Sequence, residues 1–148
     1  MEEKERKQSE EILAEIYRNC ALAIESIVDI LPEVEDDELR AEILSEHEEY
    51  ERISARASCL AKDKGVEIKE PNAFKKAMMW SSIKMSTFAD NSRNHIAEMM
   101  IRGTVMGITS LKTSQNEAYE NADSEVLALL QELIETEEKF EENLKEYL

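Results

Sequence analysis

Four long stretches of the chain place apolar residues at the spacing of an α-helix, and this pattern constrains the fold most strongly. In each stretch an apolar residue returns every three or four positions, which gives a helix one apolar stripe. The stretches cover residues 1–32, 37–64, 92–117 and 124–148. Only three Gly and two Pro occur in 148 residues, too few for a β-fold with many tight turns. The sequence therefore predicts an all-α protein with a single domain, residues 1–148.

Residues that cap helices mark several of the expected helix ends. Gly65 stands where a helix C-terminus needs a left-handed residue, and Val66 is the apolar residue that follows such a cap. Asp123 is the candidate N-cap of the last helix, and Ser9 is a candidate N-cap in the first. Pro32 stands where the first apolar pattern ends.

The lengths of the connections predict the topology. The turn at 32–36 is short, so we expect the first two helices to be antiparallel neighbours. Residues 66–91 form the one long connection and contain a predicted short fifth helix, residues 72–88. A link of this length suits a crossover along the bundle, which makes the second and third long helices parallel. The helix at 92–117 is apolar on most sides, so we expect it to be central and buried.

The charge of the chain limits its partners. It has 34 acidic and 18 basic side chains, a formal charge of −16. Nucleic-acid phosphates would be repelled, so nucleic-acid binding is not expected. The sequence has no run of about 20 apolar residues, so we expect no transmembrane segment. The N-terminal MEEKERKQSEE lacks the apolar region of a signal peptide, which makes the cytoplasm the expected location.

Two acidic residues interrupt the apolar stripes. Glu46 lies on the stripe of 37–64, and Glu137 lies on the stripe of 124–148. A buried carboxylate without partners is costly, so each is expected to be paired, protonated or bound to a metal. In a crossover bundle the carboxyls of Glu46 and Glu137 are expected in one layer at mid-height. In an up-down-up-down bundle they would lie in different layers. A partly wet core, with these carboxyls satisfied by Tyr, Asn19 or water, is the simpler reading.

A crossover bundle with inward carboxylates at mid-height resembles the ferritin-like superfamily over almost the whole chain. The resemblance extends to an uncharacterised bacterial branch through HIAEMMIRGTVMGI, residues 95–108. It implies a core that can bind iron or another divalent metal. The ligands here would be Glu46 and Glu137, with Glu49 and Glu141 as possible helpers.

The metal ligands of di-iron members are only partly present. Such proteins supply a Glu from two helices and a Glu-x-x-His motif from the other two. The two histidines of this chain, His47 and His95, follow Leu44 and Ser92 at that spacing, so neither completes the motif. A working ferroxidase is therefore not expected.

Residues 74–88 carry apolar side chains on two faces of the predicted short helix. Phe74, Met78, Met85 and Phe88 share one face, and Met79, Trp80 and Ile83 share the other. One face can pack on the bundle, and the second needs a cover. The segment 59–93 is net positive and would be attracted to the acidic body of a second copy. We therefore expect a homodimer through residues 74–88; folding under the rest of the crossover is the alternative.

Two function hypotheses follow. The first is a non-catalytic helical bundle that self-associates or binds other proteins, with no enzyme activity and no cofactor. The second is a ferritin-like metal protein with a degenerate carboxylate site between Glu46 and Glu137.

Overall fold

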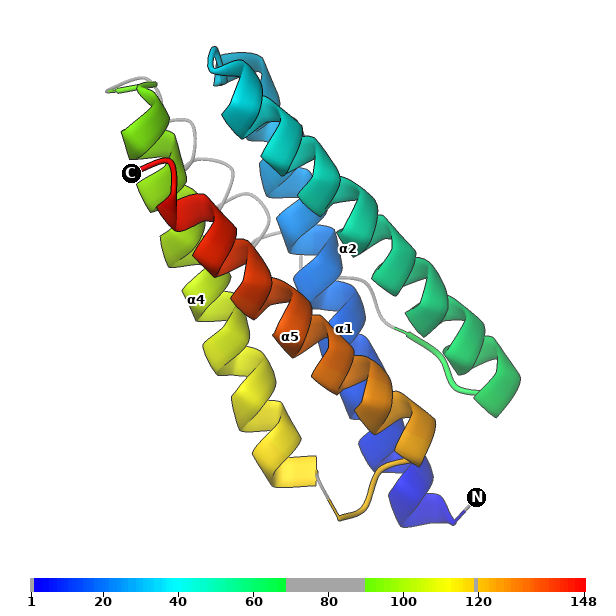
Figure 1. Cartoon of the computed structure of the whole chain (residues 1–148). Helices are drawn as coiled ribbons and strands as arrows, with labels where there is room; N and C mark the ends of the chain where they lie inside the picture. The colour runs from blue at the N-terminus through cyan, green and yellow to red at the C-terminus, as the bar shows by residue number, and fades with distance from the viewer. Residues whose placement is uncertain (1, 69–89, 119) are drawn as a thin grey trace.

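The computed structural model shows a bundle of long helices (Figure 1). The structure describes residues 2–68, 90–118 and 120–148. In these residues there is no strand, and no helix is long and apolar enough to cross a membrane. The all-α prediction is confirmed. The elements are α1 (Glu3–Ile30), the 3-10 turn η1 (Leu31–Glu33), α2 (Asp37–Lys64), α4 (Arg93–Ala118) and α5 (Ser124–Lys145).

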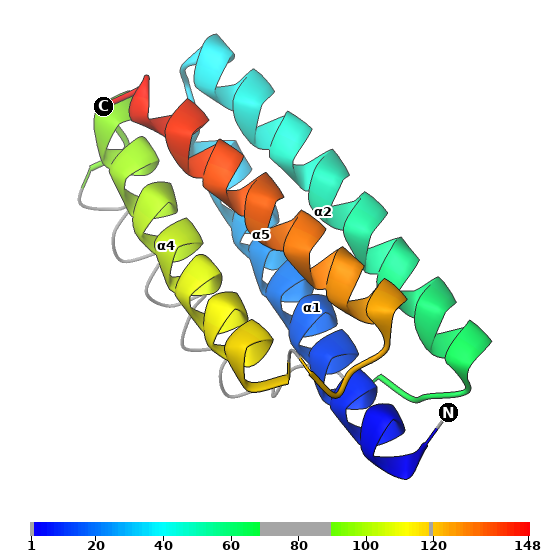
Figure 2. The same ribbon diagram turned by 60° about the horizontal axis from the view of Figure 1, so that its bottom comes forward.

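The helices α2 and α4 run in the same direction, as the long connection between them predicts. Arg93, at the start of α4, lies 3.7 Å from Asp36, which caps the start of α2. Lys64, at the end of α2, lies 3.1 Å from Asp123, which follows the end of α4. The ribbon shows α1 antiparallel to α2 and α5 antiparallel to α4 (Figure 2). The predicted short helix at 72–88 lies outside the described residues.

Capping groups fix where the helices begin and end. Gly65 adopts φ 67° and ends α2, and the N–H of Val66 donates to the carbonyl of Ala61 at 2.9 Å. The side chain of Asp123 accepts from the first turn of α5. Both predicted caps are therefore confirmed.

Ser9 is not the N-cap of the first helix, and that prediction is wrong. α1 begins six residues earlier, at Glu3. Its first turns are helical although they are almost wholly polar. Ser9 is buried inside the helix, and its hydroxyl accepts the backbone N–H of Asp123 at 2.9 Å. This hydrogen bond ties α1 to the turn before α5.

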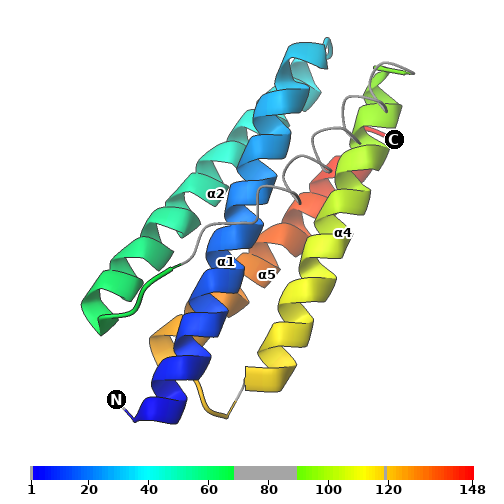
Figure 3. The ribbon, with the colours of Figure 1, turned by 180° about the vertical axis from the view of Figure 1, so that it is seen from behind.

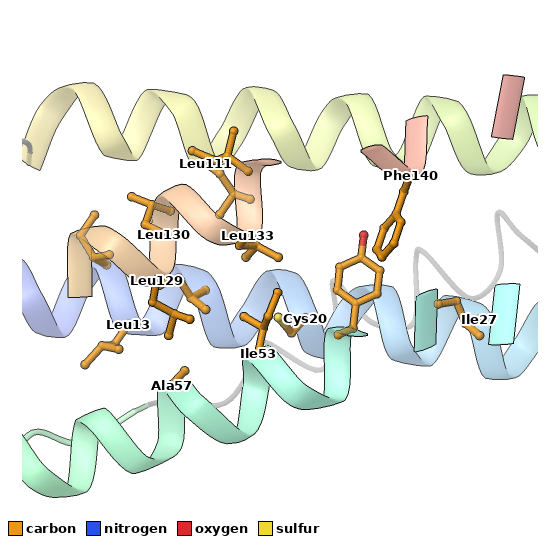
Figure 4. Packing of buried hydrophobic residues seen from close by; sticks show 14 of the residues in the cluster. Leu13, Cys20, Ile27, Ile53, Ala57, Leu111, Leu129, Leu130, Leu133 and Phe140 are labelled. Carbon is orange, nitrogen blue, oxygen red and sulfur yellow. The ribbon is translucent and has the colours of Figure 1, made fainter. Parts of the chain in front are cut away.

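The core positions of all four helices are separated alternately by four and three residues, as in a coiled coil. We call these positions the inner seam. In α1 and α2 the buried members are Ser9, Leu13, Ile16, Cys20, Ile27 and Ile30, and Leu39, Ile43, Glu46, Tyr50, Ile53, Ala57 and Leu60. In α4 and α5 they are Ala97, Thr104, Leu111 and Ala118, and Val126, Leu130, Leu133, Glu137, Phe140 and Leu144. Figure 4 shows Cys20, Ile53 and Leu133 directed into the space between the helices.

α4 is not buried on most sides, so the prediction of a central helix is wrong. It packs chiefly against α5, at one side of the bundle (Figure 3). Met106 is 74% exposed and Val105 is 40% exposed. Apolar residues lie on two sides of this helix, and only the side with the regular seam faces the core.

Candidate functional site

Glu46 and Glu137 are both buried at mid-height in the bundle, as their place on the apolar stripes predicts. Each residue is only 1% exposed. They come from α2 and α5. Burial raises the pKa of Glu46 and of Tyr50, and the charge of Glu137 adds to both shifts. The ring of Tyr50 packs against Phe140, with ring centroids 5.4 Å apart. The two carboxyls therefore belong to one polar region inside an otherwise apolar core.

Glu137 lies against the backbone of α4 at Gly107. A Cβ atom at Gly107 would stand 2.6 Å from Oε2 of Glu137 and 3.0 Å from Nδ2 of Asn19. The amide of Asn19 donates a hydrogen bond to the Glu137 carboxyl. The other oxygen, Oε1, is buried and has no hydrogen-bond partner among the described residues. The missing side chain at Gly107 thus provides the space that this carboxyl and amide occupy.

Glu46 is hydrogen-bonded to Glu42, one turn earlier in α2. Glu42 also accepts a hydrogen bond from the amide of Asn143 on α5, at 3.0 Å. Two carboxyl groups can share a hydrogen bond only if one of them carries a proton. Glu46 is the more deeply buried, so it holds the proton and donates to Glu42. Oε2 of Glu46 is buried without a partner among the described residues.

Burial makes both inner carboxyls weak acids. It raises the pKa of Glu46 to about 9, with smaller contributions from the charges of Glu42 and Glu137. Burial likewise raises the pKa of Glu137 to about 8, although the hydrogen bond from Asn19 opposes this shift. Both groups are therefore neutral carboxylic acids at pH 7. Burial, and then the Glu137 charge, raise the pKa of the Cys20 thiol to about 12, so this thiol is also neutral.

The two expected helper residues point to the surface. The carboxylate of Glu49 accepts a hydrogen bond from Arg52 at 2.8 Å. Glu141 lies 3.8 Å from Lys145, also at the outside of the bundle. Neither side chain joins the buried pair.

The described residues do not fit a divalent metal ion in the core. They contain no group of three or more His, Cys, Asp or Glu side chains placed to hold one. Each buried carboxyl also uses one oxygen for a hydrogen bond, Glu46 with Glu42 and Glu137 with Asn19. His47 lies 3.6 Å from Glu51 on the outer side of α2. The two buried carboxyls therefore lack the further donors that a metal site needs.

Sequence reasoning named Asn19 as a possible partner of the buried carboxyls and missed two other participants. Glu42 lies four residues before Glu46, on the same side of the helix, so the spacing could have identified it. Gly107 has no side chain of its own, and the side chains of Glu137 and Asn19 lie where its Cβ would stand. A glycine at the level of a buried glutamate, as Gly107 is to Glu137, is a sequence signal for such a space.

No protein-family model matches the sequence, and neither a curated protein nor a solved structure matches the chain. The function must therefore be argued from the residues themselves.

Proposed function

We propose that this chain is a non-catalytic, self-associating helical-bundle protein, built on a ferritin-like plan and acting in the cytoplasm through protein–protein contacts. One observation carries the proposal. α4 presents a group of apolar side chains outside the inner seam, with Met106 74% exposed and Val105 40% exposed. Met99 and Ile101 lie next to them in the helix, but these two are partly buried and packed against the core. Monomeric proteins rarely leave contiguous apolar surface uncovered.

In the other described helices no two exposed large apolar residues are neighbours; the exposed ones there are Val28 on α1 and Leu44 on α2. Scattered single residues of this kind are normal on a protein surface. The apolar group on α4 is therefore the described surface best suited to a protein contact; the contact expected at residues 74–88 lies outside the described residues.

The charge of α4 also favours association. Copies with a formal charge of −16 repel one another, so a contact must form where negative charge is lowest. In α4 three basic side chains stand against two acidic ones, whereas in α5 two basic stand against seven acidic. Acidic side chains also outnumber basic ones in α1 and α2. α4 is thus the described helix on which a second acidic molecule meets least repulsion.

The alternative, a ferritin-like protein with iron or another divalent metal, requires more ligands than the buried pair provides. The described residues contain no group of three or more His, Cys, Asp or Glu side chains placed to hold a metal ion. We therefore rank this function second.

The proposal is tested by substituting the exposed apolar group. Met106→Glu places a charge in the middle of it, and we expect this variant to be monomeric while the wild type is dimeric. The matched control is Leu44→Glu, at a single exposed apolar residue on α2, which should remain dimeric. Light scattering during gel filtration measures the masses, and circular dichroism checks that the helix content is retained. Identical masses for wild type and Met106→Glu would contradict the proposal.

A further inference from the structure

We infer that two copies of this chain associate through an antiparallel pair of α4 helices, with the two-fold axis passing beside Val105. The inference rests on the proposed self-association and specifies its surface and partner. The contact uses the outer strip of α4, which runs from Glu98 to Thr113 and includes Met99, Arg102, Val105, Met106 and Lys112.

The outer strip lies opposite the inner seam of the same helix. The seam residues Ala97, Thr104 and Leu111 are seven positions apart, and they face the core. The residues one, two and five positions after each seam residue lie on the opposite side of α4, because an α-helix has 3.6 residues per turn. The strip accordingly has an apolar centre at Val105 and Met106. Its two ends carry opposite charges, at Glu98 and Lys112, whose side chains are 51% and 54% exposed.

The positions of these charges select an antiparallel pair. Glu98 and Lys112 each stand seven residues from Val105, in opposite directions. In an antiparallel pair centred on Val105, each Glu98 therefore faces the Lys112 of the second copy, and this contact occurs twice. A parallel pair in register would instead oppose Glu98 to Glu98 and Lys112 to Lys112, which is repulsive.

Gly103 provides room for the partner's side chain. A Cβ atom at Gly103 would meet nothing within 4 Å, so the helix surface is bare there. Gly103 lies between Met99 and Met106 on the helix surface, where it leaves a hollow between two methionines. The antiparallel register brings the Met106 of one copy to within about 1.5 Å, along the axis, of the level of Gly103 in the other. The exposed and flexible side chain of Met106 can therefore fill the hollow at Gly103 of the second copy.

Charge reversal tests this register. Lys112→Glu and Glu98→Lys each turn two attractions into two repulsions, and we expect each to weaken the dimer about tenfold. The double variant Glu98→Lys/Lys112→Glu restores both attractions and should regain the wild-type affinity. The two residues are 14 positions apart, about 21 Å along one helix, so they cannot rescue each other within one copy. The local pairs with Arg102 and Glu138 are altered by these changes, but such effects do not produce rescue.

Cross-linking tests the axis independently of charge. Only a residue beside the two-fold axis contacts the same residue of the second chain. Val105→Cys should therefore form a disulfide-linked dimer on mild oxidation. The exposed Cys59 is first replaced by Ser, and Leu44→Cys in the same background serves as the control. Circular dichroism verifies the fold of each variant.

The outcomes separate the two claims. A monomeric wild type overturns both self-association and this pairing. If the wild type is a dimer, the pairing is overturned either by a double variant that fails to regain affinity or by a Val105→Cys link that forms no faster than the Leu44→Cys link. Rescue together with selective cross-linking supports it.

Discussion

Glu137→Gln should change how the stability of the protein depends on pH. The substitution keeps the size of the side chain and an oxygen that can accept from Asn19, but it removes the titrating group. In the wild type the folded state holds a proton on Glu137 up to about pH 8, whereas the unfolded chain releases it near the ordinary glutamate pKa of 4.5. Between these limits the folded state binds more protons, so its stability falls as the pH rises.

The size of the effect follows from the two pKa values. Each carboxyl of this kind lowers the free energy of unfolding by about 1.4 kcal/mol per pH unit within its window. Glu137 contributes this slope from 4.5 to about 8 and Glu46 from 4.5 to about 9, so their slopes add over the shared range. Cys20 does not titrate in this range, because its pKa lies at about 12. Together the two carboxyls double this slope over the shared range.

Glu137→Gln should halve this slope, to about 1.4 kcal/mol per pH unit. Relative to the wild type, the variant should therefore gain about 4 kcal/mol between about pH 5 and about pH 8. Urea unfolding followed by circular dichroism at several pH values measures the difference. Glu135→Gln, at an exposed position on the same helix, is the matched control and should change the slope far less. A variant slope equal to that of the wild type would show that Glu137 is ionised in the folded protein, which would refute the reasoning.

Two further predictions follow from the same region. In the monomeric Met106→Glu background, Gly107→Ala should destabilise the protein by about 1–3 kcal/mol in urea unfolding, because its methyl group would displace the Glu137 carboxyl. In the same background no partner side chain lies beside Gly103, so Gly103→Ala should be neutral or stabilise by up to about 1 kcal/mol, and equal effects of the two substitutions would contradict this difference. Cys59 should react with a thiol reagent in the folded protein while Cys20, which is fully buried, reacts only after unfolding; one fast and one slow phase are expected, and two fast phases would place Cys20 at the surface.

The sequence predicted the helices and their directions well, because both follow from local spacing. The stripes that include Ile43 and Leu133 predicted the buried sides of α2 and α5, and they also predicted the burial of Glu46 and Glu137. The length of the connection before α4 predicted that α2 and α4 are parallel. Gly65 predicted the end of α2, since a left-handed cap has a strong sequence preference.

The remaining features depend on contacts between helices. Ser9 resembles an N-cap in sequence, but its hydroxyl is used by the backbone of Asp123, which is far away in the chain. α4 has apolar residues on two sides, and periodicity alone does not show which side faces the core. The space at Gly107 is defined by side chains from α1 and α5, so it appears only in the folded bundle.

The mass and metal content of the wild-type chain, measured on one sample purified without chelators, test the central claim most directly. Sedimentation equilibrium at high protein concentration should give twice the chain mass of 17.0 kDa, and elemental analysis should find no stoichiometric metal. A mass of 17.0 kDa at every concentration would contradict self-association. A stoichiometric metal that is lost in a Glu46→Gln/Glu137→Gln variant would favour the ferritin-like alternative instead.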